Sequence, residues 1–321
     1  MALESPRTNG NGSPIQINWA AIRGKWDMAD TVQIFRGDGP SVVSADGRQS
    51  PLGLAVSSAS LQSGTCQVQV RFSSSFAGNN DQAGGLVLGY RSTDRPFLFA
   101  RLGGKPYAYF VGEYANGEWR MLAATGSTEN LKHDREYSLQ IKLVGQELSM
   151  VVDGVPVLQH VVPNPIEGRQ TGLIAAGTSD VSFSNFKFTY DRPRAFVVMQ
   201  FAEPYNTFYR QVIQSQAEAA GFEVFRIDEK DGPGVIFQDI QREIEQASVV
   251  IAEITPANPN VFYEVGYAHA LRKPTILLAQ RGAELPFDIR SFRVVFYNDS
   301  IAGKAEVERN LQNHLEAVAG R

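Results

Sequence analysis

Glu264 is the residue of this sequence best placed for carboxylate chemistry. The apolar strand pattern Val249–Ile254 leads into the polar loop Thr255–Asn260, and Val261–Leu271 then predicts a helix. Glu264 is thereby predicted in the first turn, where free N–H groups and the macrodipole favour an ionised carboxylate. Such a carboxylate can hydrogen-bond ribose hydroxyls, stabilise positive charge on a sugar or attack an anomeric carbon. An acidic residue in a first turn is also ordinary helix chemistry, and that alternative stays open.

Four more residues are expected to lie beside Glu264. In a doubly wound sheet of strand order 2-1-3-4-5, ligands bind at the carboxyl edge, where the order reverses between strands one and three. The first predicted strand ends at Phe201 and the second at Asp228. The loop after the third strand holds Asn258 and Asn260. These residues are therefore predicted to converge with Glu264 on one crevice.

The elements that must position these residues begin at residue 194, where apolar runs alternate with helical patterns. The predicted strands are Ala195–Phe201, Phe222–Asp228, Val249–Ile254, Thr275–Gln280 and Arg293–Tyr297. The predicted helices are Tyr205–Ala220, Val235–Ala247, Val261–Leu271 and Lys304–Val318. This alternation predicts a parallel sheet with helices on both faces. Five such strands predict a flavodoxin-like α/β domain over residues 194–321.

The preceding residues predict a different architecture. Residues 1–14, rich in Ser, Asn, Gly and Pro, are expected to form a flexible leader. Residues 15–190 alternate apolar and polar side chains in short segments, and no segment sustains a helical period. Asp153-Gly154, between two apolar alternations, is a strong hairpin signal. We therefore predict a multidomain chain in which an all-β jelly-roll sandwich of about a dozen strands precedes the α/β domain.

Composition and charge argue against several classes of protein. The 321 residues carry a net charge of −4, with 17 basic and 17 acidic residues up to Arg192 and 13 and 17 beyond it. Because phosphate contacts dominate nucleic-acid binding, a chain without a basic domain is not expected to bind nucleic acid. No apolar run approaches the roughly 20 residues of a membrane span, and no signal-peptide pattern is present. A cytoplasmic protein that binds no membrane is expected.

Several catalytic motifs are absent from the sequence. Cys66 is the only cysteine and the four histidines lack metal-ligand spacing, so no metal site is predicted. Ala202-Glu203-Pro204 follows the first strand of the α/β domain in place of a glycine-rich phosphate loop. This disfavours a hydride-transferring Rossmann enzyme and a P-loop NTPase. The lack of a Gly-x-Ser-x-Gly elbow disfavours a serine hydrolase, and no bound cofactor is expected.

The run Asn258–Pro274, with its Asn-Pro-Asn-Val-Phe-Tyr-Glu-Val-Gly-Tyr-Ala-His-Ala core, resembles the signature of bacterial Toll/interleukin-receptor-like (TIR-like) domains. It also resembles the related nucleoside 2-deoxyribosyltransferases. Phe196–Phe201, Arg226–Glu229 and Leu285–Asp288 fit the TIR-like group in the expected order, so the resemblance spans nearly all of the α/β domain. Members of this superfamily cleave N-glycosidic bonds of NAD+ or of nucleosides. Their key glutamate occupies the position held here by Glu264.

The resemblance implies roles for further residues. Phe201 and Tyr263 would line the base or nicotinamide pocket and Asp228 would contact ribose. Ordinary packing of the two rings, and a loop-capping role for Asp228, remain alternatives. His269 lies off the helical face of Glu264 and is expected to pack or cap. The family often has Asp where this chain has Glu253, and the extra methylene is expected to reshape the pocket floor.

The N-terminal half resembles concanavalin/laminin-G-like jelly rolls. The likeness rests on Gly84–Tyr90, Trp119, Tyr137–Leu143, Val152–Gly154 and Gly172–Ile174. Modules of this kind bind carbohydrates or proteins, or mediate assembly. The aromatic side chains of Tyr107, Tyr109 and Trp119 are candidates for stacking on sugar rings, with core packing as the alternative.

Three functions follow from the resemblance. The first is an NAD+ glycohydrolase, hydrolysing or cyclising, in a bacterial immune effector that self-assembles through its TIR-like domain and whose sandwich binds a signal, a carbohydrate or a protein. The second is a nucleoside or nucleotide N-glycosidase or deoxyribosyltransferase. The third is a non-catalytic module that binds a nucleotide or another TIR-like domain, with Glu264 structural.

Overall fold

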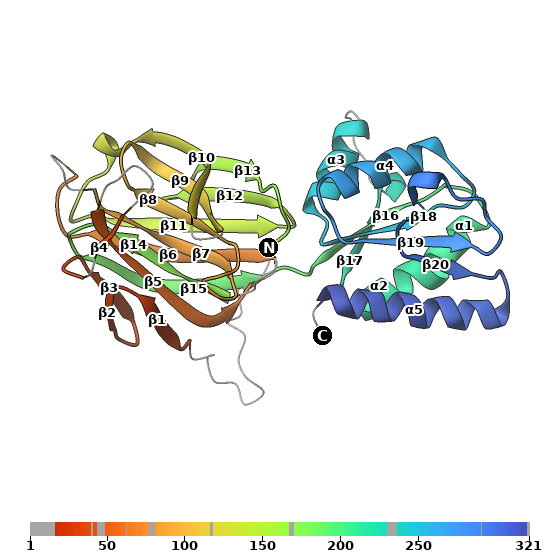
Figure 1. The fold of residues 1–321 in the computed structure, drawn as a ribbon, viewed down its shortest axis with the longest axis horizontal. Coiled ribbons are helices and arrows are strands. Elements are labelled where there is room, and N and C mark those ends of the chain that lie inside the picture. Colours follow the sequence, from red (N-terminus) through yellow and green to blue (C-terminus); the bar gives the residue numbers. More distant parts are fainter. Residues whose placement is uncertain are drawn as a thin grey trace. The chain divides into compact units, whose positions relative to one another are not determined.

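The computed structural model describes residues 17–39, 41–43, 49–61, 63–76, 81–115, 118–166, 170–229, 236–289 and 291–319. The predicted leader, residues 1–14, lies outside these ranges. The chain forms two compact units, and the main division along the sequence falls between Thr189 and Tyr190. Figure 1 shows an all-β unit followed by an α/β unit.

The N-terminal unit is a sandwich of two antiparallel sheets, as predicted (Figure 1). The eight-stranded sheet has the order β1-β5-β14-β7-β8-β9-β10, with β4 paired to β5. Its strands are β1 (Trp19–Arg23), β4 (Ser41–Val43), β5 (Gln49–Ser60), β7 (Ala83–Tyr90), β8 (Phe97–Gly103), β9 (Tyr107–Ala115), β10 (Glu118–Ser127) and β14 (Gln170–Ala176).

The seven-stranded sheet has the order β13-β12-β11-β6-β15-β3-β2. Its strands are β2 (Lys25–Met28), β3 (Val32–Arg36), β6 (Gly64–Phe72), β11 (Glu136–Val144), β12 (Glu147–Val152), β13 (Val155–Val161) and β15 (Val181–Tyr190), and a short 3₁₀ turn, η1 (Thr128–Asn130), precedes β11. The described residues thus form fifteen strands, more than the dozen predicted. Short strands such as β1, which is mostly exposed, carry little apolar alternation for the sequence to reveal.

Asp153-Gly154 forms the predicted hairpin turn between β12 and β13. Both residues have positive φ, 51° for Asp153 and 81° for Gly154. A two-residue hairpin loop of type I′ requires positive φ at both positions, which Asp-Gly adopts at little cost.

The α/β unit is built on a five-stranded parallel sheet of order β17-β16-β18-β19-β20. This is the predicted order 2-1-3-4-5. The strands are β16 (Arg194–Val198), β17 (Glu223–Arg226), β18 (Val249–Glu253), β19 (Thr275–Gln280) and β20 (Val294–Tyr297). The first two strands end earlier than predicted, so Phe201 and Asp228 lie in the connections that follow them.

The helices pack on both faces of this sheet, with α3 and α4 on one side and α2 and α5 on the other (Figure 1). The predicted first helix is one continuous helical run with a π-helical middle, α1 (Tyr205–Phe208), η2 (Tyr209–Gln214) and α2 (Ser215–Ala219). The others are α3 (Ile236–Gln246), α4 (Pro259–Ala270) and α5 (Ile301–Ala319), with 3₁₀ turns η3 (Ile227–Glu229) and η4 (Phe287–Ile289). None of the described helices is long and apolar enough to cross a membrane.

Strand β16 separates two hydrophobic cores. Ala195 and Val197 pack with η2, α2 and α5, whereas Phe196 and Val198 pack with α3 and α4. Successive strand side chains point to opposite faces, so each core takes every second residue of the strand. A site at the carboxyl edge of the sheet therefore lies between two separate hydrophobic cores, one on each face of the sheet.

Candidate functional site

Glu264 lies in the second turn of α4, so its predicted place in the first turn was wrong. Helix α4 begins at Pro259, two residues before the predicted start, and Glu264 is its sixth residue. Asn258 is the N-cap, and its Oδ1 accepts the N–H of Asn260 at 2.9 Å. A capping side chain followed by proline at the first helical position starts a helix early. The free N–H groups of α4 therefore lie a full turn before Glu264.

The ionisation of Glu264 also differs from expectation. Burial raises the pKa of its carboxyl to about 7 instead of stabilising the charged form. The side chain is half-buried and, within the part of the chain that the structure describes, makes no hydrogen bond or ion pair. A carboxyl with this pKa is present in both protonation states at neutral pH, and its hydrogen-bonding capacity is available to a ligand.

The neighbours of Glu264 on α4 are exposed. Tyr263 has 55% of its surface exposed, and its ring lies 5.7 Å from that of Phe237 on α3. Tyr263 is therefore not a core residue, and its contact with Phe237 leaves packing between helices as the alternative to a role in the pocket. Asn260 is also exposed, whereas Asn258 is partly buried and already engaged as the helix cap.

Arg226 joins the predicted residues Phe201 and Asp228. Its guanidinium forms a two-bond ion pair with Asp228, with Nε–Oδ1 at 2.5 Å and Nη2–Oδ2 at 2.6 Å. The same group lies 5.2 Å from the ring centroid of Phe201, which is 46% exposed. Phe201 is thus not a core residue, and the Asp228 carboxylate is held by Arg226.

Arg226 itself is buried and fully engaged. It is 7% exposed, donates to Asn206 Oδ1 at 2.9 Å and lies 4.3 Å from the ring centroid of Tyr209. Sequence reasoning did not single out this arginine. The sequence does show a cation at the end of an apolar strand, two residues before an aspartate. It does not show that Arg226 contacts Asn206 and Tyr209, because these residues come from another element. Bidentate arginine–carboxylate pairing fixes the orientation of both groups.

Glu253 ends the central strand β18 on the face covered by η2 and α5. It is 1% exposed, and its Oε1 accepts the N–H of Thr255 at 2.8 Å. The Tyr297 hydroxyl also hydrogen-bonds the carboxyl. Its Oε2 is buried without a partner among the described residues. Burial raises the pKa of Glu253 to about 8.

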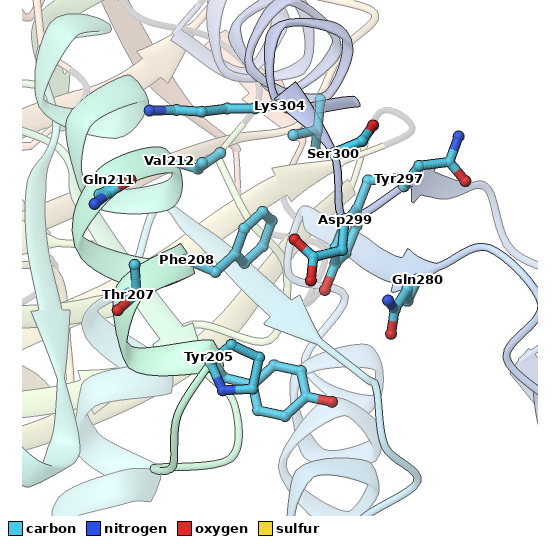
Figure 2. A pocket seen from close by; sticks show the side chains of 13 residues that line it. Tyr205, Thr207, Phe208, Gln211, Val212, Gln280, Tyr297, Asp299, Ser300 and Lys304 are labelled. Carbon is cyan, nitrogen blue, oxygen red and sulfur yellow. The ribbon is translucent and has the colours of Figure 1, made fainter. Parts of the chain in front are cut away.

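Figure 2 shows residues that line a cavity of the α/β unit. The cavity has a volume of about 160 Å³. Tyr205 and Tyr297, whose pKa values are both affected by the Glu253 carboxyl, contribute to its lining. The remaining walls come from the first helical run, from Gln280 at the end of β19 and from the start of α5.

The predicted site residues do not line this cavity. The strand order β17-β16-β18 brings the connections that hold them to neighbouring positions along one sheet edge, as expected. Contacts join Phe201 and Asp228 through Arg226, and Asn258 to Asn260. The roles of these residues in substrate binding, and that of Glu264 in catalysis, stay predictions.

The His269 ring stacks on Phe292 at 4.2 Å, in agreement with the packing role expected for it. Among the described residues, no group of three or more His, Cys, Asp or Glu side chains is arranged to hold a metal ion.

Comparison with protein-family models and with curated proteins finds no match. Among solved structures, the carbohydrate-binding module CBM66 of Bacillus subtilis is 19% identical, covers 53% of this chain and 94% of its own, and has a TM-score of 0.44. The exoplasmic/lumenal domain of VIP36, bound to Ca²⁺ and Man3GlcNAc, is 12% identical with 61% and 92% coverage and a TM-score of 0.40. The TIR domain of the Toll-related receptor TRR-2 of Hydra magnipapillata is 19% identical, with 38% and 97% coverage and a TM-score of 0.32.

Proposed function

We propose that the α/β unit hydrolyses the nicotinamide–ribose bond of NAD+, with Glu264 as the catalytic carboxylate. The observation that carries this proposal is the state of Glu264. It is half-buried on the helix that follows the central strand, has a pKa of about 7 and has no polar partner in the described part of the chain. The TIR-like sequence pattern around it supplies the reaction class.

The proposed reaction needs one carboxylate and one water. The ionised Glu264 carboxylate accepts hydrogen bonds from the ribose hydroxyls and stabilises the positive charge that develops as the C1′–N bond breaks. Nicotinamide leaves as a neutral molecule, taking the bonding electron pair. Water adds to C1′ and loses a proton, so NAD+ and water give ADP-ribose, nicotinamide and H⁺. Attack by a nucleophile of the same molecule in place of water gives a cyclic product.

Phe201, Tyr263 and Asp228 provide the proposed binding surface. Both aromatic rings are about half exposed, so a nicotinamide or adenine ring can stack on them. Asp228, oriented by Arg226, would hydrogen-bond ribose hydroxyls. Asn258 and Asn260 would contact the substrate at the start of α4.

A nucleoside N-glycosidase or deoxyribosyltransferase is the second candidate, and the pKa of Glu264 favours it. A nucleobase is a poor leaving group unless protonated, whereas nicotinamide leaves NAD+ without a proton. A carboxyl with a pKa of about 7 can donate that proton at neutral pH.

The test is incubation of the concentrated full-length protein with NAD+ and, separately, with deoxynucleosides, followed by chromatography of the products. High concentration is used because the TIR-like resemblance implies activation by self-assembly. Nicotinamide release that Glu264→Gln abolishes supports the first function, and free base released from a nucleoside supports the second. Lack of turnover with either substrate, in the presence of macromolecular crowding agents as well, favours the non-catalytic binding module.

For the sandwich, we propose a carbohydrate ligand at the eight-stranded sheet. A Cβ built on Gly84 would lie 2.7 Å from Val181 and 3.0 Å from Val70 of the other sheet, so Gly84 faces the interior. Val87 points the opposite way and belongs to a second cluster of buried residues with Phe97 and Phe99, against which partly buried Tyr114 and Trp119 pack. The exposed parts of the Tyr114 and Trp119 rings are aromatic surface on which a sugar ring could stack.

The sandwich proposal is tested with a glycan array probed by the wild type and by Trp119→Ala. A glycan bound by the wild type and lost in the variant supports the proposal. Tyr107→Ala is the control variant and is expected to keep the binding of the wild type. Tyr107 is 36% exposed and takes part in none of the ring contacts of the cluster. No bound glycan, or equal binding by Trp119→Ala, contradicts it.

A further inference from the structure

The cavity of Figure 2 lies on the sheet face opposite to α4 and Glu264. Its wall is aromatic on one side, where the rings of Phe208 and Tyr297 stack almost parallel, 4.5 Å apart at 15°. The two rings cover one another, and the outer face of the partly buried Phe208 ring is flat apolar surface on which a planar aromatic ligand can stack.

Three side-chain amides belong to the lining of the cavity, and Figure 2 shows Gln211 and Gln280 on opposite sides of Phe208 and Tyr297. Gln211, Gln280 and Asn298 line the cavity, and their side chains make no hydrogen bond within the described part of the chain. A carboxamide offers one acceptor and two donors side by side. It therefore pairs with a ligand edge that carries a donor next to an acceptor, as nucleobases and primary amides do.

A buried acid group interacts with two tyrosines of the cavity wall. Glu253 hydrogen-bonds Tyr297 and lies within electrostatic reach of Tyr205, and both tyrosines line the cavity. Glu253 Oε2 has no partner among the described residues. Glu253 itself does not line the cavity, so its carboxyl acts on a ligand only through the two tyrosines.

The size and charge of the cavity restrict the ligand further. The cavity, with a volume of about 160 Å³, has room for one or two fused rings. The charged lining residues are Asp299 and Lys304, of opposite sign, and Lys304 also pairs with Glu308 at 3.7 Å. The lining has no net charge to attract an ion.

We propose that this cavity binds a planar, uncharged nitrogen heterocycle with an amide-like edge, of the size of a nucleobase or nicotinamide. The ligand ring stacks on the outer face of Phe208, and its polar edge pairs with the Gln280 amide. The site is separate from the surface around Glu264, so the ligand binds whether or not the protein cleaves N-glycosidic bonds.

The experiment measures dissociation constants of nicotinamide and hypoxanthine for the full chain by saturation-transfer NMR titration. Two small molecules serve as matched controls. Nicotinate has the ring and size of nicotinamide but is an anion, and cyclohexanecarboxamide has the amide but no planar ring. Both controls are expected to bind at least tenfold more weakly than nicotinamide.

Protein variants locate the site. Gln280→Met keeps side-chain length but removes the amide, and it is expected to weaken binding of both heterocycles about tenfold. Gln214→Met is the control, because Gln214 lies on the same helical run as Gln211, donates to Glu218 at 3.1 Å and does not line the cavity. Glu264→Gln is expected to leave the dissociation constants unchanged.

The outcomes separate this site from the proposed reaction. Binding that is weakened in Gln280→Met and kept in Glu264→Gln supports the site, with or without NAD+ turnover. Absence of heterocycle binding, binding of nicotinate as tight as that of nicotinamide, or equal affinity in Gln280→Met and Gln214→Met overturns it. Loss of binding in Glu264→Gln moves the ligand to the Glu264 surface, which overturns the cavity site and leaves the reaction standing.

Discussion

Glu264 and Glu253 both lie near the carboxyl edge of the parallel sheet. Burial raises the pKa of both carboxyls, but they differ in exposure and in hydrogen bonding. The pKa rises to about 7 for Glu264 and to about 8 for Glu253. Glu253 is sealed, 1% exposed and hydrogen-bonded to Thr255 and Tyr297. Glu264 is half-buried and, among the described residues, unpartnered.

The difference teaches that a raised pKa alone does not mark a catalytic group. A sealed acid with fixed donors has its protonation set by the fold, and it reaches a ligand only through Tyr205 and Tyr297. A half-buried acid without partners keeps its hydrogen-bonding capacity for a substrate. Accessibility together with missing partners therefore distinguishes the proposed catalytic carboxyl from the sealed carboxyl of Glu253.

The largest expected effect tests the open carboxyl. Glu264→Gln removes the charge that would stabilise the sugar cation, so nicotinamide release from NAD+ is expected to fall at least about a hundredfold. Wild-type turnover is expected to rise with pH through about 7 as Glu264 ionises. Glu218→Gln, an exposed acid on α2, is the control, and equal rates in the two variants would remove Glu264 from the mechanism.

The second prediction tests the sealed carboxyl through stability. The folded-state pKa of Glu253 lies above its ordinary value of 4.5, so its contribution to stability is fully present below pH 4.5 and is lost as pH rises through about 8. Tyr205 and Tyr297, which face it, have raised pKa values and do not titrate in this range.

Glu253→Gln is therefore expected to gain unfolding free energy relative to the wild type between pH 5 and about 8, as measured by urea denaturation. Glu264→Gln should gain unfolding free energy relative to the wild type over a narrower pH range, which ends near pH 7. Parallel wild-type and Glu253→Gln profiles would mean that this acid is not held in its protonated form.

The third prediction compares two arginines with similar contacts. Arg226→Lys loses the two-bond pair with Asp228, and the KM for NAD+ is expected to rise about tenfold with a smaller change in kcat. Arg194, at the amino end of β16, bonds Glu243 at 2.7 Å and lies over the Phe225 ring. Arg194→Lys should change stability but not KM, and equal KM values for the two variants would refute a positioning role for Arg226.

The smallest expected effect concerns the start of α4. Asn258→Ala removes the N-cap and is expected to lower the unfolding free energy by about 1 kcal/mol. Asn260→Ala keeps the cap and should leave stability unchanged. If Asn258 acts only as a cap, Asn258→Ala keeps the wild-type KM. An increased KM in Asn258→Ala or in Asn260→Ala indicates that the replaced side chain contacts the substrate.

The local patterns of the sequence were sufficient for most elements of the fold. Strand β19 has its predicted bounds, and the Asp153-Gly154 turn forms where expected, because both depend on short-range patterns. The start of α4 was misplaced because Asn258 competes as a cap with the apolar pattern that begins at Val261. That competition moved Glu264 from the first turn to the second.

The site was predictable only in part, since its partners come from distant elements. The sequence placed Phe201 and Asp228 at one sheet edge, and the structure adds the buried arginine that joins them. The sequence marked Glu253 as a departure from a family pattern. Its burial depends on η2, β20 and α5 packing over the end of β18, which no local pattern encodes.

Hydrophobic periodicity alone determined the two-unit architecture and the parallel sheet, because side-chain burial follows the period of each element. Only the tertiary structure decided which carboxyl is sealed and which is left without a partner, and which cation holds Asp228. Desolvation and hydrogen bonding act between residues that folding brings together from separate segments, so these properties belong to the packed chain.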